Sequence, residues 1–190
     1  MTTMAPIAQD RVLDVGVDDG DWRASNFLEA TYPWPDRITA VAPSAMPGFQ
    51  ARFPAVSFVV GDGRALPFAD RSFEIGFSNA VIEHVGGRED QRRLVAEMLR
   101  TCRRVFICTP NAGFPIDPHT LLPFVHWLPR GLRHPILRAT GNGRWASVST
   151  LEPLTAGHLL ALFPAASRPR LIRQRAAGLA TVLIVVAGLP

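Results

Sequence analysis

The stretch Arg11-Val12-Leu13-Asp14-Val15-Gly16 decides the fold that this sequence predicts. Its apolar run and terminal glycine are typical of a buried strand of a parallel sheet, followed by a tight turn. Similar apolar runs recur and alternate with segments of helical period, which indicates an α/β domain. These further strands are predicted at residues 37–42, 56–60, 73–79 and 105–109.

The segments between and after these strands complete the predicted layout. Residues 22–32 predict a short helix with Phe27 and Leu28 facing inward, and residues 43–53 predict a poor helix or a loop interrupted by proline. Residues 88–101 carry the clearest helical stripe, and a capped helix is expected at 155–163. Two last strands, 168–176 and 180–187, are joined at Gly178 too closely for a crossover, so they predict an antiparallel hairpin. We therefore expect a Rossmann-like, doubly wound sheet of about seven strands, mostly parallel with an antiparallel C-terminal hairpin.

Length and composition restrict the class of protein. The 190 residues predict one domain over 1–190, with an inserted lid or substrate segment at 110–150 that is rich in proline. All 20 basic residues are arginine, and the net charge of +4 does not predict a nucleic-acid partner, because the arginines are spread along the chain without interleaved aromatic residues. Cys102 and Cys108 are too few for a disulfide framework and are interpreted as small core residues. Without an N-terminal signal or an apolar run of about 20 residues, we expect a cytoplasmic protein.

Glycine and acidic residues follow three of the predicted strands. They occur in Asp14-Val15-Gly16-Val17-Asp18-Asp19-Gly20, in Gly61-Asp62-Gly63, and in the stretch from Phe73 to His84 that includes Ser78-Asn79-Ala80. Ligands of open α/β sheets bind outside the carboxyl ends of the strands, where these residues should meet. In order and spacing, residues 11–109 resemble the class I S-adenosylmethionine-dependent methyltransferases, in particular the group called methyltransferase type 11.

The resemblance implies a cofactor, S-adenosylmethionine, and a site for it. It places the methionine part of the cofactor against Asp14, Gly16 and the loop through Asp18 to Gly20. It implies that Asp62 accepts a hydrogen bond from the adenine amino group, with Gly63 adjacent, and that Asn79 and Ala80 approach the methionine end. A carboxylate is an acceptor suited to an exocyclic amine, although an aspartate before glycine also caps turns.

Two residues depart from the family pattern. Asp18 stands where the family has the middle glycine of the first loop, and Ala42 ends the second strand where the family has an acid that binds both ribose hydroxyls. Loss of that carboxylate costs about 1.5–3 kcal/mol, unless Asp18 or Asp19 reaches the ribose instead. The first strand also begins near residue 11, so we expect an open pocket that the insertion, a partner subunit or an upstream segment closes.

Histidines provide the candidate catalytic residues. His84 follows the fourth strand on the cofactor side, and His119 lies after the fifth strand in Asp117-Pro118-His119. A histidine is suited to removing a proton from the methyl acceptor, because its ordinary pKa is about 6.5. Local capping and loop hydrogen bonds explain the same residues without catalysis. A third ligand at metal-binding spacing is missing from the sequence, so we expect no metal site.

The function predicted from these residues is methyl transfer from S-adenosylmethionine to a small-molecule or lipid-like acceptor. The alternative is a binding or regulatory module on the same fold with a degraded cofactor site. Residues 121–127 are strongly apolar and arginines follow them, which is compatible with a lid on the domain's own core, or with peripheral membrane contact. A homodimer is compatible with the sequence. A nicotinamide dehydrogenase is disfavoured, because Gly-x-Gly-x-x-Gly is absent.

Overall fold

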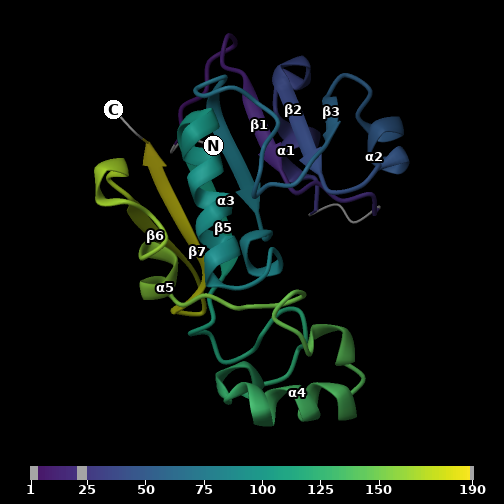
Figure 1. Ribbon diagram of the computed structural model, residues 1–190, viewed down its shortest axis with the longest axis vertical. Helices are drawn as coiled ribbons and strands as arrows, with labels where there is room; N and C mark the ends of the chain where they lie inside the picture. Colours follow the sequence, from purple (N-terminus) through teal and green to yellow (C-terminus); the bar gives the residue numbers. More distant parts are fainter. Residues whose placement is uncertain (1–3, 21–24, 189–190) are drawn as a thin grey trace.

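A seven-stranded sheet forms the centre of the computed structural model, which describes residues 4–20 and 25–188 (Figure 1). The strand order is β3-β2-β1-β4-β5-β7-β6. Strands β1 to β5 pair in parallel, and β7 is antiparallel to both β5 and β6. The predicted sheet, with its antiparallel C-terminal hairpin, is therefore confirmed. The strands are β1 (Val12–Val15), β2 (Ile38–Ala42), β3 (Ser57–Val60), β4 (Phe73–Asn79), β5 (Cys102–Pro110), β6 (Arg170–Ala176) and β7 (Leu179–Gly188).

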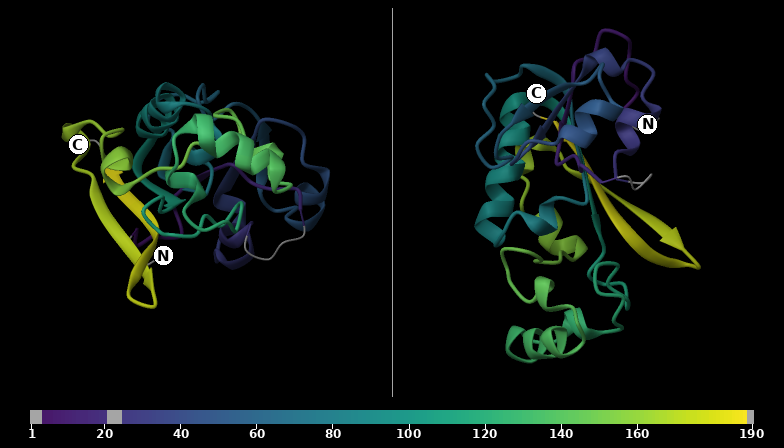
Figure 2. Two further views of the ribbon diagram at one scale, coloured as in Figure 1. Left: turned by 90° about the horizontal axis from the view of Figure 1, so that it is seen from below. Right: turned by 90° about the vertical axis from the view of Figure 1, so that its right-hand side faces the viewer.

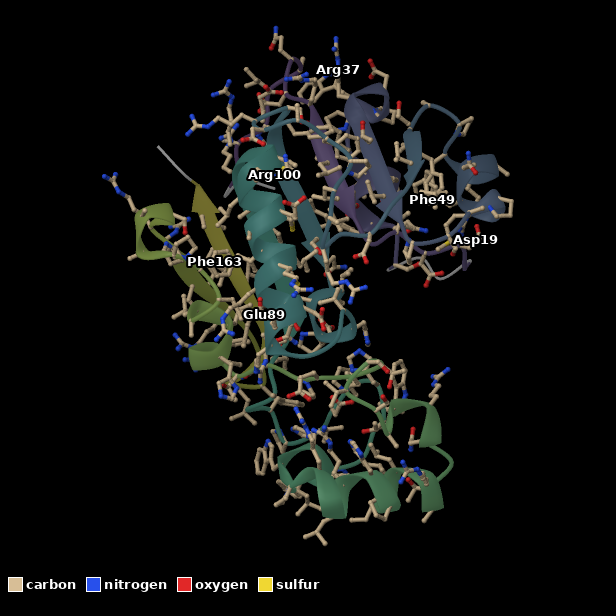
Figure 3. All side chains as sticks on the ribbon, in the orientation of Figure 1. Asp19, Arg37, Phe49, Glu89, Arg100 and Phe163 are labelled. Carbon is tan, nitrogen blue, oxygen red and sulfur yellow. The ribbon has the colours of Figure 1, made fainter. Side chains whose placement is uncertain are left out.

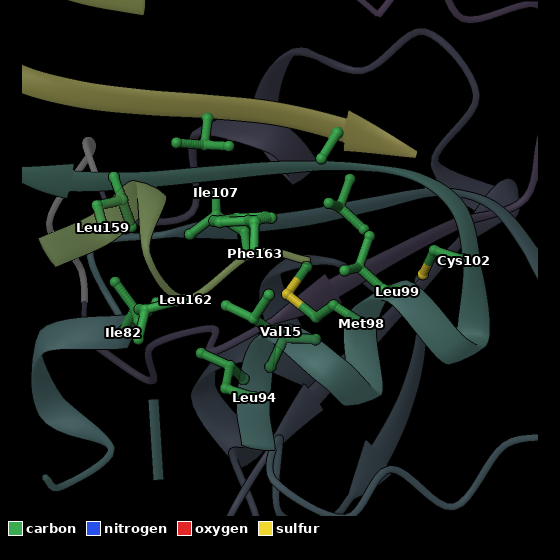
Figure 4. Close-up of a cluster of buried hydrophobic side chains, with 14 of the residues drawn as sticks. Val15, Ile82, Leu94, Met98, Leu99, Cys102, Ile107, Leu159, Leu162 and Phe163 are labelled. Carbon is green, nitrogen blue, oxygen red and sulfur yellow. The ribbon is translucent and has the colours of Figure 1, made fainter. Parts of the chain in front are cut away.

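Helices cover the sheet on two faces. On one face, α3 and α5 pack over β1, β4, β5 and β7 and enclose a cluster that includes Leu94, Met98, Ile107 and Leu159 (Figure 4). On the other face, α1 and α2 pack over β1 to β3. The α-helices are α1 (Phe27–Thr31), α2 (Pro47–Arg52), α3 (Arg88–Thr101), α4 (Arg130–Ala139) and α5 (Ala156–Leu160). Short 3-10 helices are η1 (Pro35–Arg37), η2 (Ile82–His84), η3 (Val125–Trp127), η4 (Gly143–Trp145) and η5 (Ala165–Ser167).

Helix α1 differs from the prediction for residues 22–32. It begins at Phe27, and residues 22–24 lie outside the described residues. Leu28 is buried as expected, but Phe27 is 51% exposed, so the inward position predicted for it is wrong. Five residues of helix present one buried stripe, and Leu28 and Glu29 already occupy it. Residues 43–53 do contain a helix, α2, which begins at a proline in its first turn.

The connection between β3 and β4 contains no helix and is held by one arginine of α3. Arg100 donates to the carbonyl oxygens of Leu66 (3.1 Å) and Phe68 (2.8 Å) and pairs with Asp70 at 2.7 Å (Figure 3). Glu97 accepts a hydrogen bond from the Leu66 amide at 2.8 Å. These contacts fix the segment that starts with Gly61-Asp62-Gly63, so they also position part of the candidate site.

The segment from 110 to 150 projects beyond the carboxyl ends of the strands (Figure 1). It contains η3, α4 and η4, and α4 tolerates Pro135 in its interior. The turn between β6 and β7 also extends away from the rest of the molecule, past the carboxyl end of β5 (Figure 2). That turn has Ala177 and Gly178 at positive φ, 49° and 81°, which matches a two-residue hairpin connection.

Candidate functional site

A cavity of about 410 Å³ opens at the carboxyl ends of the parallel strands. Its walls come from the ends of β1, β2 and β3 and from η2, which follows β4. We call it the cofactor cavity. The residues that line it include Gly16, Ala42, Pro43, Gly61, Asp62, Gly63, Arg64, Val81, His84, Asp90 and Ser149. Three of the predicted cofactor residues, Gly16, Asp62 and Gly63, therefore line one cavity.

Gly16 gives the turn after β1 its shape. Its φ is +100°, and a Cβ atom there would lie 2.2 Å from Val81 Cγ2. A residue with a side chain therefore cannot occupy this position without displacing Val81 from the wall of the cavity. Gly63 is similarly enclosed, since a Cβ atom would lie 2.8 Å from Val15 and from Leu94.

The loop after Gly16 is tied to the protein itself. The Asp18 carboxylate accepts a hydrogen bond from the Gly20 amide, and the Asp19 carboxylate accepts one from the Phe49 amide of α2 at 2.7 Å (Figure 3). Neither acid lines the cofactor cavity, and neither does Gly20. The structure therefore does not place Asp18 or Asp19 where either could replace the ribose-binding acid that is missing at the end of β2. Ala42 lines the cavity at the end of β2, as the sequence places it.

Asp14 forms a buried carboxyl pair with Glu29 of α1. Both residues are only 5% exposed. Burial raises the pKa of Asp14 well above its ordinary value of 3.8, and the neighbouring Glu29 raises it further. Burial also raises the pKa of Glu29, although the interaction with Asp14 partly offsets the effect. Asp14 thus lies outside the cofactor cavity. Its pairing with Glu29 could not be predicted from the sequence pattern.

Asp62 lies in the cofactor cavity but is not a free acceptor. The Arg64 guanidinium donates to both of its carboxylate oxygens, at 3.0 and 2.7 Å, and Arg64 also pairs with Asp90 at 3.3 Å. These hydrogen bonds lower the pKa of Asp62 and keep it ionised. The expected hydrogen bond to an adenine amino group therefore requires Arg64 to share or release this carboxylate. Asp62 and Arg64 are two residues apart in the sequence, but this spacing alone does not show whether the pair forms.

Asn79 and Ala80 lie at the end of β4 but outside the cofactor cavity. Ala80 has a positive φ of 55° and donates its amide hydrogen to the Cys108 carbonyl oxygen at 2.9 Å. Asn79 lines a second cavity, of about 460 Å³, on the α1 face of the sheet. This second cavity is mostly apolar and includes Phe27, Phe77 and Phe106. The structure therefore separates Asn79 from Gly16 and Asp62.

The two predicted catalytic histidines meet in space. His84 in η2 and His119 in the projecting segment place their Nε2 atoms 3.1 Å apart, with the rings nearly perpendicular. Glu83, which is 1% exposed, points its Oε1 at the same place, 4.0 Å from His84 Nε2 and 3.8 Å from His119 Nε2. We call these three residues the His–His–Glu cluster. The carboxylate is the third group that sequence spacing did not reveal.

Neighbouring groups hold each member of the cluster by its other polar atom. His84 Nδ1 lies 2.7 Å from the Thr150 carbonyl oxygen, and Thr109 donates its hydroxyl hydrogen to Glu83 Oε2 at 2.8 Å. His119 Nδ1 faces Asp117 Oδ1 at 3.4 Å. Burial raises the pKa of Asp117, but interactions with His119 and the backbone amides of His119 and Thr120 outweigh it, so the net shift is downward. Asp117 and His119 thus face each other across two positions of the sequence.

Burial raises the pKa of Glu83, while the neighbouring histidines and Thr109 partly offset this effect. Trp145 forms a wall beside both imidazole rings, with centroid distances of 5.5 Å to His84 and 5.2 Å to His119. His84 also lines the cofactor cavity. The cluster therefore lies between that cavity and the projecting segment, where a group bound beside the cofactor would meet it.

Comparison with known proteins finds methyltransferases. Residues 13–105 match a family model described as a methyltransferase domain. Demethylmenaquinone methyltransferases are similar: that of Roseiflexus sp. (strain RS-1) is 27% identical over 80% of this chain and 55% of the relative, and that of Roseiflexus castenholzii is 32% identical over 65% and 51%. The chain therefore spans about half the length of these relatives.

Solved structures share the fold. A methyltransferase described as SAM-dependent, from Methanosarcina mazei, superposes with a TM-score of 0.61 at 15% identity, covering 99% of this chain and 96% of that one. The 1,6-didemethyltoxoflavin-N1-methyltransferase of Burkholderia thailandensis, solved with S-adenosylhomocysteine, gives 0.58 at 19% identity, covering 94% and 70%.

Among residues 4–20 and 25–188, no helix is both long and apolar enough to cross a membrane. The position of the cofactor cavity at the carboxyl ends of β1 to β3, with the enclosed Gly16 and Gly63, fits the cofactor of this class. Residues 13–105 therefore match a methyltransferase domain, and nearly the whole chain shares its fold with solved methyltransferases described as SAM-dependent.

Proposed function

We propose that this chain transfers a methyl group from S-adenosylmethionine to a small hydrophobic acceptor. The observation that carries the proposal is the position of His84. It lines the cofactor cavity, and its Nε2 atom meets His119 at 3.1 Å, so groups able to activate an acceptor lie beside the cofactor. Positioning of this kind is the main requirement of an in-line displacement.

The reaction needs an electron pair on the acceptor. The acceptor atom forms a bond to the methyl carbon, the bond from carbon to sulfur breaks, and its electrons remain on sulfur as S-adenosylhomocysteine forms. An acceptor hydroxyl or other protonated group must also lose a proton. The His–His–Glu cluster is where we place this activation, with His84 and His119 as the residues through which the acceptor is activated.

The projecting segment supports a hydrophobic acceptor. Leu121, Phe124 and Trp127 are 74%, 55% and 52% exposed, and Leu121 follows His119 by two residues. Exposed apolar side chains grouped in this way are typical of binding surfaces. The relatives named demethylmenaquinone methyltransferases have a hydrophobic acceptor, which agrees with this class.

The alternative is a module that binds the cofactor without turnover. Two observations favour it: Ala42 offers no carboxylate to the ribose, and Arg64 occupies both oxygens of Asp62. Both differences weaken cofactor binding relative to the family pattern. A methyl-transfer measurement distinguishes the alternative from the proposal.

Titration calorimetry with S-adenosylmethionine and S-adenosylhomocysteine tests the cofactor site. We expect binding that Asp62→Ala weakens about tenfold or more, since a hydrogen bond to a charged group contributes about 1.5–3 kcal/mol. Arg64→Ala should tighten binding, because it frees the Asp62 carboxylate. Asp36→Ala is the matched control, since this exposed carboxylate lies outside the cavity. Tight cofactor binding that is unchanged in both Asp62→Ala and Arg64→Ala would contradict the assigned site.

Transfer of a labelled methyl group to hydroquinones of increasing apolar chain length tests the activity. Product formation that His119→Ala abolishes, with cofactor affinity retained, supports the proposal. Cofactor binding without product from any acceptor of this class leaves the binding module as the better account.

A further inference from the structure

We propose that Glu83, His84 and His119 bind a divalent transition-metal ion, Zn²⁺ being the best match, through Glu83 Oε1 and the two Nε2 atoms. Two imidazoles and one carboxylate form a common ligand set for zinc sites that keep a fourth position open. The distance between the two Nε2 atoms is 3.1 Å. Two nitrogens on one tetrahedral zinc ion lie about 3.3 Å apart, so the pair needs almost no rearrangement.

The hydrogen bonds around the imidazoles point both lone pairs at the same place. His84 Nδ1 lies 2.7 Å from the Thr150 carbonyl oxygen, which only accepts, so Nδ1 carries the hydrogen and the Nε2 of neutral His84 carries a lone pair. His119 Nδ1 faces the Asp117 carboxylate at 3.4 Å, which favours a hydrogen on Nδ1 there too. With both hydrogens on Nδ1, the two Nε2 lone pairs at 3.1 Å repel each other unless a cation lies between or beside them.

Glu83 provides an independent observation. Its Oε1 is buried and has no hydrogen-bond partner among the described residues, while Oε2 is held by the Thr109 hydroxyl at 2.8 Å. The side chain is 1% exposed, and Oε1 is aimed at the gap between the two Nε2 atoms. A buried carboxylate oxygen without a donor is costly, and a cation at this point satisfies it.

The surroundings also match those of metal sites. Ligating histidines usually donate their second ring hydrogen to a carbonyl or carboxylate, and ligating carboxylates are themselves hydrogen-bonded. Thr150 and Thr109 supply two of these interactions, and the Asp117 carboxylate faces His119 Nδ1 at 3.4 Å, in position to supply the third. Glu83 Oε1 lies 3.8 and 4.0 Å from the nitrogens, so a rotation that brings it several tenths of an ångström closer completes the site.

A single extra proton is the competing occupant. A doubly protonated His119 faces Asp117 with its Nδ1 and donates from Nε2 to His84, which also removes the repulsion between lone pairs. A proton, however, leaves Glu83 Oε1 without a direct hydrogen bond, since neither nitrogen lies within about 3.2 Å of it. Three convergent ligand atoms therefore favour the metal ion.

With the metal bound, three protein ligands leave one position for a water molecule or an oxygen of the acceptor. This last step rests on the proposed function. A bound zinc ion lowers the pKa of a coordinated hydroxyl, so the acceptor oxygen loses its proton and attacks the methyl carbon as an anion. The proton then leaves to solvent or to a neighbouring base, and the metal keeps its charge throughout.

The test is metal binding by the full chain purified without a histidine tag. After treatment with a chelator, the protein is titrated with Zn²⁺ alone and with Co²⁺ alone. We expect one ion per chain, a visible Co²⁺ spectrum typical of tetrahedral nitrogen and oxygen ligands, and a partial loss of tryptophan fluorescence with Co²⁺, because Trp145 lies beside both imidazoles. His119→Ala should abolish saturable binding, and Asp117→Asn should weaken it about 10–100-fold.

His158→Ala is the matched control, because this imidazole on α5 contacts Arg88 of α3 and lies outside the cluster. Glu83→Gln keeps the shape of the side chain, and its melting temperature without metal shows whether the variant folds. A lack of saturable Zn²⁺ or Co²⁺ binding, or binding unchanged in His119→Ala, would overturn the inference. Calorimetry with S-adenosylmethionine on the same samples separates this failure from failure of the proposed function, because His119 and Asp117 lie outside the cofactor cavity.

Discussion

Gly16 gives a sharp test at the scale of a single residue. Its φ of +100° and the 2.2 Å separation between an added Cβ atom and Val81 Cγ2 predict that Gly16→Ala lowers the free energy of unfolding by about 1–3 kcal/mol. Denaturant unfolding measures this change. In Gly131→Ala, the added Cβ atom on α4 meets no atom within 4 Å, so this control should be neutral or more stable by up to about 1 kcal/mol. Equal losses in both variants would contradict the role of Val81.

The buried pair of Asp14 and Glu29 predicts a pH dependence of stability. Both folded-state pKa values are raised above the ordinary values of 3.8 and 4.5. The protonated forms therefore favour folding at low pH, and this contribution is lost as the pH rises through the raised values.

Glu29→Gln removes one of the two titrating groups. We expect the variant to unfold at higher denaturant concentration than the wild type at pH 8, by about 1 kcal/mol or more, and to show less change in stability between pH 5 and pH 8. Unfolding curves at both pH values measure this. Glu89→Gln, at a surface carboxylate that is 67% exposed, should leave the pH dependence intact.

Individual residues also show where sequence reasoning was effective. His84 and His119 were identifiable because each follows a strand at the carboxyl edge of the sheet, and the fold brings them together across 35 positions. Arg64 and Glu29 were missed as partners, because whether a carboxylate is free or paired depends on side-chain packing. The position of Asp62 was therefore predictable, and its occupation by Arg64 was not.

At the scale of elements, the strands were the most predictable. Their apolar runs are long and bounded by glycine, proline or aspartate, and β4 lies where it was expected. Helix α1 was harder, because in so short a segment Phe27 and Leu28 compete for one buried stripe. The connection between β3 and β4 was equally hard to predict, since its order comes from the distant Arg100 and not from a local pattern.

The projecting segment predicts contact with lipid. Phe124, Trp127 and Leu132 are exposed, and Arg138 at the end of α4 adds positive charge beside them. We expect the chain to float with anionic phospholipid vesicles at low salt and to do so less at high salt. The double variant Phe124→Ser/Trp127→Ser should lose this binding while keeping its affinity for S-adenosylmethionine. Wild-type protein that stays unbound at low salt would show that this segment serves the acceptor or the domain's own core alone.

At the scale of the whole molecule, cofactor binding should stabilise the fold. The cofactor cavity draws its walls from several separate elements, and binding to the native state alone adds about 2.7 kcal/mol to the free energy of unfolding at a ligand concentration 100 times the Kd. A thermal shift that grows with S-adenosylmethionine concentration measures this. Asp62→Ala should require more ligand for the same shift, and an unchanged melting temperature at saturating cofactor would contradict binding to the native state.

The position of β7 has a consequence for how the protein is made. This strand lies inside the sheet, between β5 and β6, and pairs with β5 from Arg104–Gly188 to Pro110–Val182. While the chain is being synthesised, one edge of β5 therefore stays unpaired until residues 179–188 have left the ribosome. An apolar strand with a free edge is a site for aggregation and chaperone binding. Folding of this sheet is consequently completed only after nearly all of these residues have been translated, and a nascent chain arrested before residue 179 should depend on chaperones to remain in solution.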